Sequence, residues 1–185
     1  MTENDLIKLA GEHSILLFVS GTGAVSHKIK EYSPGKRKVE DRISHIAAFG
    51  KNPATNQWTV TESHFKTKGV KEKTFSEFLE QNEGVKYAIK YPHLNYYSMT
   101  VLAAVKTPYP VKDIWDLYKQ GQLQKGFSFF QFTDSSKDHV GAHCAESICK
   151  CDYGVLEGKM KKRADEISPN EIFETLYLEN VVRSV

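Results

Sequence analysis

Residues 43–63 carry the sequence ISHIAAFGKNPATNQWTVTES, which predicts two β-strands joined by a turn. Ile43 to Phe49 is apolar enough for a buried strand, and Gln57 to Ser63 alternates between apolar and polar side chains. The linking residues, Asn52 to Asn56, are typical of a turn. We therefore expect these two strands to form a β-hairpin.

The rest of the chain predicts further strands and helices that do not alternate strictly. Strands are expected at 14–20 and 96–105, a loop or short strand at 127–132, and helices at 24–32, 75–81, from 110, within 142–149 and from 168, where Ser168 and Glu171 form a capping box. No repeat or linker divides the sequence, so we expect a single domain spanning 1–185. This mixture predicts an α+β fold.

Composition narrows the classes of function. The chain has 185 residues, 40% of them hydrophobic and 26% charged, with a net charge of +2. This mild charge does not favour nucleic acid as a partner, because phosphate binding needs a concentrated basic surface. The one basic run, residues 66–73, is interpreted as a solvated loop or strand end.

No segment is long and apolar enough for a transmembrane helix; the run from Ile15 to Val19 is far too short. The acidic, polar N-terminus does not resemble a secretory signal. We therefore expect a protein that is cytoplasmic or phage-borne.

The three cysteines lie close together near the end of the chain, at positions 144, 149 and 151. An odd, clustered set is not typical of a disulfide framework. Cys144 falls at or near the start of the helix expected within 142–149. There the helix dipole and free backbone N–H groups would make a thiol more acidic and bind an oxyanion. The alternative is that Cys144 is simply a small buried residue.

Two polar residues stand out in the predicted hairpin. His45 lies within an apolar strand, and Glu62 shares a face of the next strand with Trp58 and Val60. As cross-strand neighbours, the carboxylate would orient the imidazole, as a general base requires. The alternatives are a half-buried, hydrogen-bonded histidine and a glutamate that points to solvent.

A zinc site is a rival interpretation of the region around Cys144. His139 and His143, together with the three cysteines, provide His-x3-His and Cys-x-Cys spacings. However, Cys144 and Cys149 would lie about 140° apart around one helix, and the paired Cys-x2-Cys of common zinc sites is missing. The turn Gly21-Thr-Gly23 lacks the residues of a phosphate loop. We therefore expect no metal and no cofactor.

Taken together, these segments resemble the YiiX/YebB-like hydrolases, relatives of the NlpC-type peptidases whose papain-like fold is circularly permuted. The resemblance covers residues 14 to 175. Five motifs carry it in the right order: the opening strand, glycine turn and helix at 14–29, Ser44-His-Ile-Ala-Ala48, Val60-Thr-Glu-Ser63, His143-Cys-Ala-Glu-Ser147 and Ser168-Pro-Asn-Glu171. The chain departs from the family pattern at His143, Ala145 and Ala47, where an aromatic residue, serine and glycine are usual.

The resemblance implies a permuted papain-like domain with an antiparallel sheet packed against helices. It also implies that Cys144 is the nucleophile, His45 the base and Glu62 the residue that orients the base. The implied substrates are amide bonds of cell-wall peptides or related γ-glutamyl peptides. Two alternatives stay open: an acyltransferase or esterase acting on lipid, because the lecithin:retinol acyltransferase group shares the permuted fold, and a non-catalytic virion or zinc-stabilised binding protein.

Overall fold

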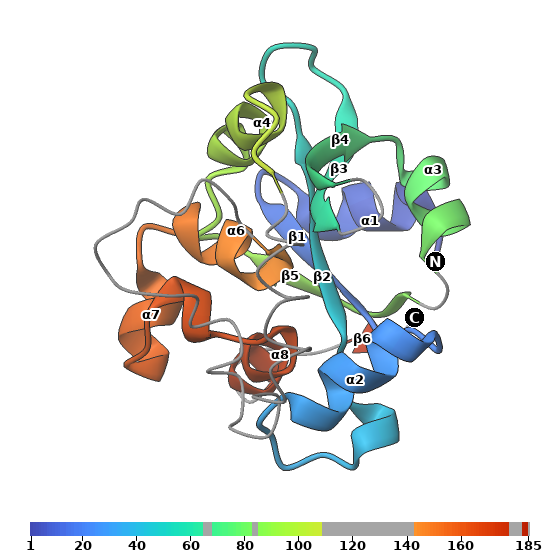
Figure 1. Ribbon diagram of the computed structural model, residues 1–185. Helices are drawn as coiled ribbons and strands as arrows, with labels where there is room; N and C mark the ends of the chain where they lie inside the picture. The colour runs from blue at the N-terminus through green and yellow to red at the C-terminus, as the bar shows by residue number, and fades with distance from the viewer. Residues whose placement is uncertain (65–67, 83–84, 109–142, 178–182, 185) are drawn as a thin grey trace.

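The computed structural model describes residues 1–64, 68–82, 85–108, 143–177 and 183–184 (Figure 1). Its centre is a six-stranded sheet with the order β4-β3-β2-β1-β5-β6, in which every neighbouring pair is antiparallel. The strands are β1 (Ser14–Val19), β2 (His45–Lys51), β3 (Trp58–His64), β4 (Gly69–Lys73), β5 (Val85–Tyr91) and β6 (Arg183–Ser184). The expected α+β class with an antiparallel sheet is confirmed.

Helices cover the sheet on both sides. They are α1 (Glu3–Ala10), α2 (Ala24–Tyr32), α3 (Phe75–Gln81), α4 (Tyr96–Ala104), α6 (Cys144–Lys150), α7 (Val155–Met160) and α8 (Pro169–Tyr177), with short 3-10 turns at η1 (Val39–Asp41) and η3 (Ala164–Glu166). Capping boxes start α1 at Thr2 and α3 at Thr74, because each threonine accepts a bond from the backbone N–H three residues later. The helices expected at 24–32, at 75–81, within 142–149 and from 168 are confirmed.

Two apolar clusters hold the layers together. β1 is buried along its whole length, so its alternate side chains face opposite layers. Ile15 and Leu17 pack with residues of α1 and α3, whereas Leu16 and Phe18 pack with residues of α4, α6, α7 and α8. Burying each such side chain contributes about 1.5–3 kcal/mol. The sheet is therefore the middle layer of three (Figure 1).

The hairpin expected from residues 43–63 is present as β2 and β3. Its ladder runs from Lys51 opposite Trp58 to Ala48 opposite Thr61. Beyond Ala48, β2 continues to His45 alongside β1, and β3 continues to His64 alongside β4. The two strands therefore separate at this end of the hairpin, and α6 contacts both of them.

The strand expected at 96–105 is wrong, because residues 96–104 form helix α4. Asn95 caps this helix by accepting a bond from the N–H of Ser98 at 3.2 Å. Tyr96 and Met99 are buried at the i, i+3 spacing of one helix face. The aromatic and β-branched residues of this segment favoured a strand by propensity, and tertiary packing outweighed that preference. The helix expected from 110 and the segment 127–132 lie outside the described residues.

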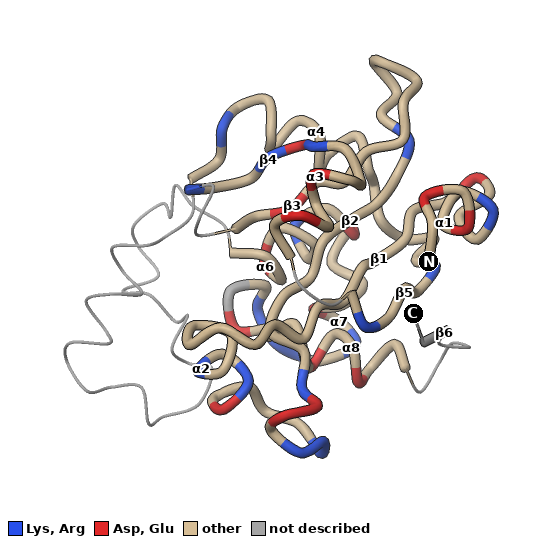
Figure 2. The backbone as a smooth tube through the Cα atoms, turned by 90° about the vertical axis from the view of Figure 1, so that its right-hand side faces the viewer, with Lys and Arg blue, Asp and Glu red and all other residues tan. Residues whose placement is uncertain are grey.

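Acidic and basic residues are mixed along the described backbone (Figure 2). Helix α1 carries Glu3, Asp5 and Lys8, and β4 carries Glu72 between two lysines. Neither of these elements presents a stripe of one sign.

We expect Gly50→Ala to destabilise the protein by about 1–3 kcal/mol. A Cβ atom at Gly50 would lie 2.5 Å from Cγ of the buried Tyr96 ring, whose hydroxyl is held by a 2.6 Å bond to the Thr59 carbonyl. The free energy of unfolding, measured by urea titration, tests this prediction.

Gly158→Ala is the matched control and should have the opposite sign. Gly158 lies inside α7, and a Cβ there would have nothing within 4 Å. Alanine in a helix interior should therefore stabilise the protein by about 0.5–1 kcal/mol. Equal effects of the two substitutions would contradict the packing described for Tyr96.

Candidate active site

The start of α6 positions Cys144 as the first helical residue. His143 is the N-cap, with extended backbone angles of φ −79° and ψ 176°. Its Nδ1 accepts a bond from the N–H of Glu146 at 3.4 Å, and its own N–H donates to Oε2 of Glu146 at 3.2 Å. This reciprocal capping box fixes where the helix begins. Cys144 is 6% exposed at this point.

His45 and Glu62 lie together at the end of the hairpin where β2 and β3 separate. Nε2 of His45 is 2.5 Å from Oε2 of Glu62, and Glu62 is only 1% exposed. Continuing the strand register would place His64 opposite His45, so Glu62 reaches His45 diagonally; the rings of His45 and His64 meet edge to face at 5.0 Å. The alternative that Glu62 points to solvent is excluded.

The thiol of Cys144 lies within hydrogen-bonding range of the His45 ring. Because Nε2 of His45 faces Glu62, Nδ1 is the ring nitrogen left for the sulfur. The three residues singled out from the sequence are therefore adjacent, in the order sulfur, imidazole, carboxylate. This is the arrangement of an activated nucleophile whose base is oriented by a third group.

The electrostatics of the three groups favour a thiolate beside an imidazolium. Burial alone would raise the pKa of Cys144, but hydrogen bonds and charges from His143 and His45 outweigh it and lower that pKa to about 6. Burial alone would lower the pKa of His45, yet Cys144 and Glu62 raise it to about 10. Each group of the pair thus stabilises the charged form of the other.

Glu62 is held in its ionised form by two cationic partners. Burial raises the pKa of this carboxyl, but His45 and Lys73 outweigh it and lower the pKa to about 2. Nζ of Lys73 is 2.6 Å from Oε1 of Glu62, and Nδ2 of Asn82 donates to Oε2 at 3.2 Å. The carboxylate therefore has a partner on each oxygen.

The sequence interpretation missed Lys73, Asn82 and the contact of His143 with the thiol. Lys73 ends the basic run that was interpreted as solvated, and for Lys73 this is wrong, because its side chain is only 7% exposed and pairs with Glu62. The signal available in the sequence was alternation, which places Lys71 and Lys73 on the same face of β4. The structure then pairs β4 with β3 and sets Lys71 opposite Glu62, while the side chain of Lys73 makes the contact. His143 was noted only as a possible zinc ligand and as a departure from the family motif.

The other two cysteines are also buried: Cys149 lies within α6, and Cys151 is the C-cap of that helix. Burial raises the pKa of Cys149 well above its ordinary value and that of Cys151 to about 12. Within the ranges that the structure describes, no group of three or more His, Cys, Asp or Glu side chains is arranged to hold a metal ion. His139, one of the ligands considered for zinc, lies outside those ranges.

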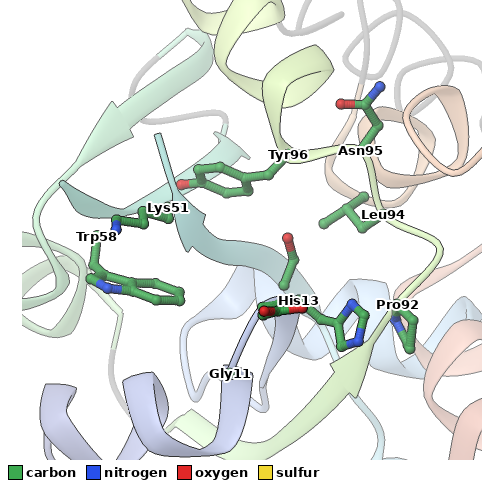
Figure 3. Close-up of a pocket in the computed structure, with 10 residues that line it drawn as sticks. Gly11, His13, Lys51, Trp58, Pro92, Leu94, Asn95 and Tyr96 are labelled. Carbon is green, nitrogen blue, oxygen red and sulfur yellow. The ribbon is translucent and has the colours of Figure 1, made fainter. Parts of the chain in front are cut away.

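A separate cavity of about 260 Å³ lies at the turn end of the hairpin (Figure 3). Lys51, Trp58, Asn95 and Tyr96 line it. The amide of Asn95 donates to the Tyr153 hydroxyl at 2.5 Å, and the Tyr96 hydroxyl donates to the Thr59 carbonyl of β3 at 2.6 Å. The amide of Asn95 and the hydroxyl of Tyr96 thus already have hydrogen-bond partners, and the cavity is distinct from the Cys144 site at the opposite end of the hairpin.

No protein-family model, curated protein or solved structure matches this chain. Among the described helices, none has both the length and the apolar character needed to cross a membrane. The function of the protein has therefore to be inferred from the geometry of the site.

We expect iodoacetamide near neutral pH to modify Cys144 at least about tenfold faster than Cys149 or Cys151, because only the Cys144 thiol is substantially ionised there. Mass-spectrometric mapping of the modified peptides over time measures the three rates. Cys144→Ser should remove the fast phase and leave the slow ones. Preferential modification of Cys149 or Cys151 would contradict the charge distribution described for the site.

Proposed function

We propose that this protein is a cysteine hydrolase that cleaves amide bonds through a thioester intermediate. One observation carries the proposal: the Cys144 thiol contacts an imidazole, His45, whose far nitrogen lies 2.5 Å from the buried carboxylate of Glu62. A cysteine with only a packing role does not need a base beside it. A histidine with only a packing role does not need a carboxylate to orient its ring. The lowered pKa of Cys144 agrees with a nucleophile.

The first half of the reaction is acylation. The Cys144 thiolate attacks the substrate carbonyl carbon, a C–S bond forms and the carbonyl oxygen becomes an oxyanion. The N–H groups of Cys144 and Ala145 have no carbonyl acceptor within their own helix, so they are available to bind that oxyanion. The His45 imidazolium then donates its proton to the leaving amine as the C–N bond breaks.

Deacylation returns the enzyme to its starting state. His45, now neutral, takes a proton from a water molecule, which attacks the thioester carbonyl. The C–S bond breaks, the carboxylic acid is released and the thiolate re-forms beside the protonated ring. Glu62 keeps the ring in one orientation through both half-reactions, because its Oε2 holds Nε2 and leaves Nδ1 for the sulfur.

The fold that fits this function is the circularly permuted papain-like one. Supporting it are the chain order of histidine, acid and then cysteine, and the packing of the cysteine-bearing helix against the strands that carry the other two groups. The resemblance to YiiX/YebB-like hydrolases points to cell-wall peptides or γ-glutamyl peptides as substrates. Lipid esters are the competing substrate class within the same chemistry.

We expect Cys144→Ala to abolish turnover without unfolding the protein, because alanine fills most of the same space and removes only the sulfur. His45→Ala should lower kcat about a hundredfold or more. Glu62→Gln should cost less, because that residue orients the base and transfers no proton. Release of amine from muropeptides and γ-glutamyl peptides, and of fatty acid from phospholipid, measures the activity.

Thermal unfolding of each variant is the necessary control, since Glu62→Gln leaves the buried Lys73 without its carboxylate. The double variant Glu62→Gln, Lys73→Met removes the unpaired ammonium as well. It therefore separates the loss of His45 orientation from the loss of protein stability. Undiminished turnover by Cys144→Ala would exclude the thioester mechanism. Fatty-acid release in place of amine release would move the substrate class to lipids.

We expect a bell-shaped dependence of kcat/KM on pH. Below about pH 6 the Cys144 thiolate becomes protonated and the nucleophile is lost. Above about pH 10 the His45 imidazolium loses the proton that the leaving amine requires. Initial rates across this range measure both limbs. An acidic limb at the pKa of an ordinary thiol, about 8.5, would mean that the ion pair does not form.

A further inference from the structure

Lys73 is the one lysine of β4 whose side chain is buried. Its Nζ lies 2.6 Å from Oε1 of Glu62 and 2.6 Å from the side-chain oxygen of Gln81 at the end of α3. By contrast Lys71, two residues earlier on β4, stands opposite Glu62 in the strand register and is exposed. The fold thus selects one of two nearby lysines and buries it against the carboxylate.

The neighbours of Lys73 keep its ammonium in a fixed position. Asn82 donates from its side chain to Glu62 at 3.2 Å and to the carbonyl of Phe78 at 3.2 Å. Gln81 accepts from Lys73, so the last residue of α3 contacts the lysine while Asn82, the C-cap of α3, contacts Glu62. Taking an ammonium out of water is costly, and hydrogen bonds of this kind are what make it tolerable.

The charges alternate in sign along the contacts: thiolate, imidazolium, carboxylate, ammonium. Each oxygen of Glu62 has its own cation, Oε2 with His45 and Oε1 with Lys73. Without Lys73, the full negative charge of the carboxylate would act on His45. That charge would hold the proton on the ring and oppose its transfer to a leaving group.

Other charged or titratable groups lie beside the same contacts. Glu77 on α3 and Lys73 attract each other, and His64 on β3 lies edge to face with His45. His143, the N-cap of α6, interacts with the thiol. Among these neighbours, Lys73 is the one that contacts Glu62 on the oxygen turned away from His45.

We propose that Lys73 is a positioning residue of the candidate active site, which shares the charge of Glu62 and so allows His45 to release its proton as well as accept it. This inference rests on the proposed function of Cys144 and His45. It adds a fourth group that never touches the substrate and acts only through Glu62.

Loss of the ammonium removes one positive charge from the vicinity of all three groups. Negative potential favours the protonated form of every titrating site, so both limbs of the pH profile should move to higher pH. Lys73→Met tests this with a side chain of similar length, and Lys73→Gln tests it with one that retains a hydrogen bond to Glu62. Lys73→Arg restores the charge.

The experiment measures the rate of Cys144 alkylation by iodoacetamide across pH, which needs no substrate. Lys73→Met should shift the profile upward by about half a pH unit or more, with Lys73→Arg close to wild type. Lys71→Met is the matched control: it removes the same charge from the exposed lysine of the same strand and should leave the profile unchanged. If Lys73→Met does not fold, Lys73→Gln should show the same upward shift of the alkylation profile.

A folded Lys73→Met or Lys73→Gln protein with the wild-type profile would overturn this inference while leaving the proposed function intact. An equal shift in Lys71→Met would also overturn it, because the effect would then be one of general surface charge. A wild-type Cys144 that titrates as an ordinary thiol would overturn the proposed function and this inference together.

Discussion

The site depends on a carboxylate buried at the end of the hairpin. An isolated ionised carboxylate in such a place would be prohibitively unstable, so Glu62 persists there only because it is paired on both oxygens, with His45 at 2.5 Å and Lys73 at 2.6 Å. Removing one partner of a buried pair typically costs about 3–5 kcal/mol. Together with the contacts among Cys144, His143 and His45, this placement sets the charge states of the thiol and the imidazole.

The separation of β2 and β3 makes room for that arrangement. Up to Ala48 and Thr61 the strands are hydrogen-bonded to each other, and beyond this point each is held by its outer neighbour, β1 or β4. Helix α6 contacts both strands, so its first residue, Cys144, can approach a ring carried by one strand and oriented by an acid on the other. A hairpin that stayed paired to its end would close this approach.

Local patterns in the sequence were sufficient for the hairpin and for the start of α8, because the alternation, the turn residues and the Ser168–Glu171 capping box each lie within a few positions along the chain. They were insufficient for α4, since the β-prone residues after Asn95 form a helix only through packing of Tyr96 and Met99 on the sheet. Lys73 was missed for a related reason: the β3–β4 register places Lys71 opposite Glu62, and only the side-chain contact across the folded sheet shows that Lys73 is its partner.

The order of the groups along the chain also bears on how the protein is made. The hairpin with the imidazole and the acid is complete long before the ribosome reaches α6, and domains form from the N-terminus during synthesis. The sulfur meets its base only when α6 docks, which is a contact between distant parts of the sequence and therefore a late one. A nascent or partly folded chain thus carries an ordinary, weakly nucleophilic thiol, and its reactivity begins with the completed fold.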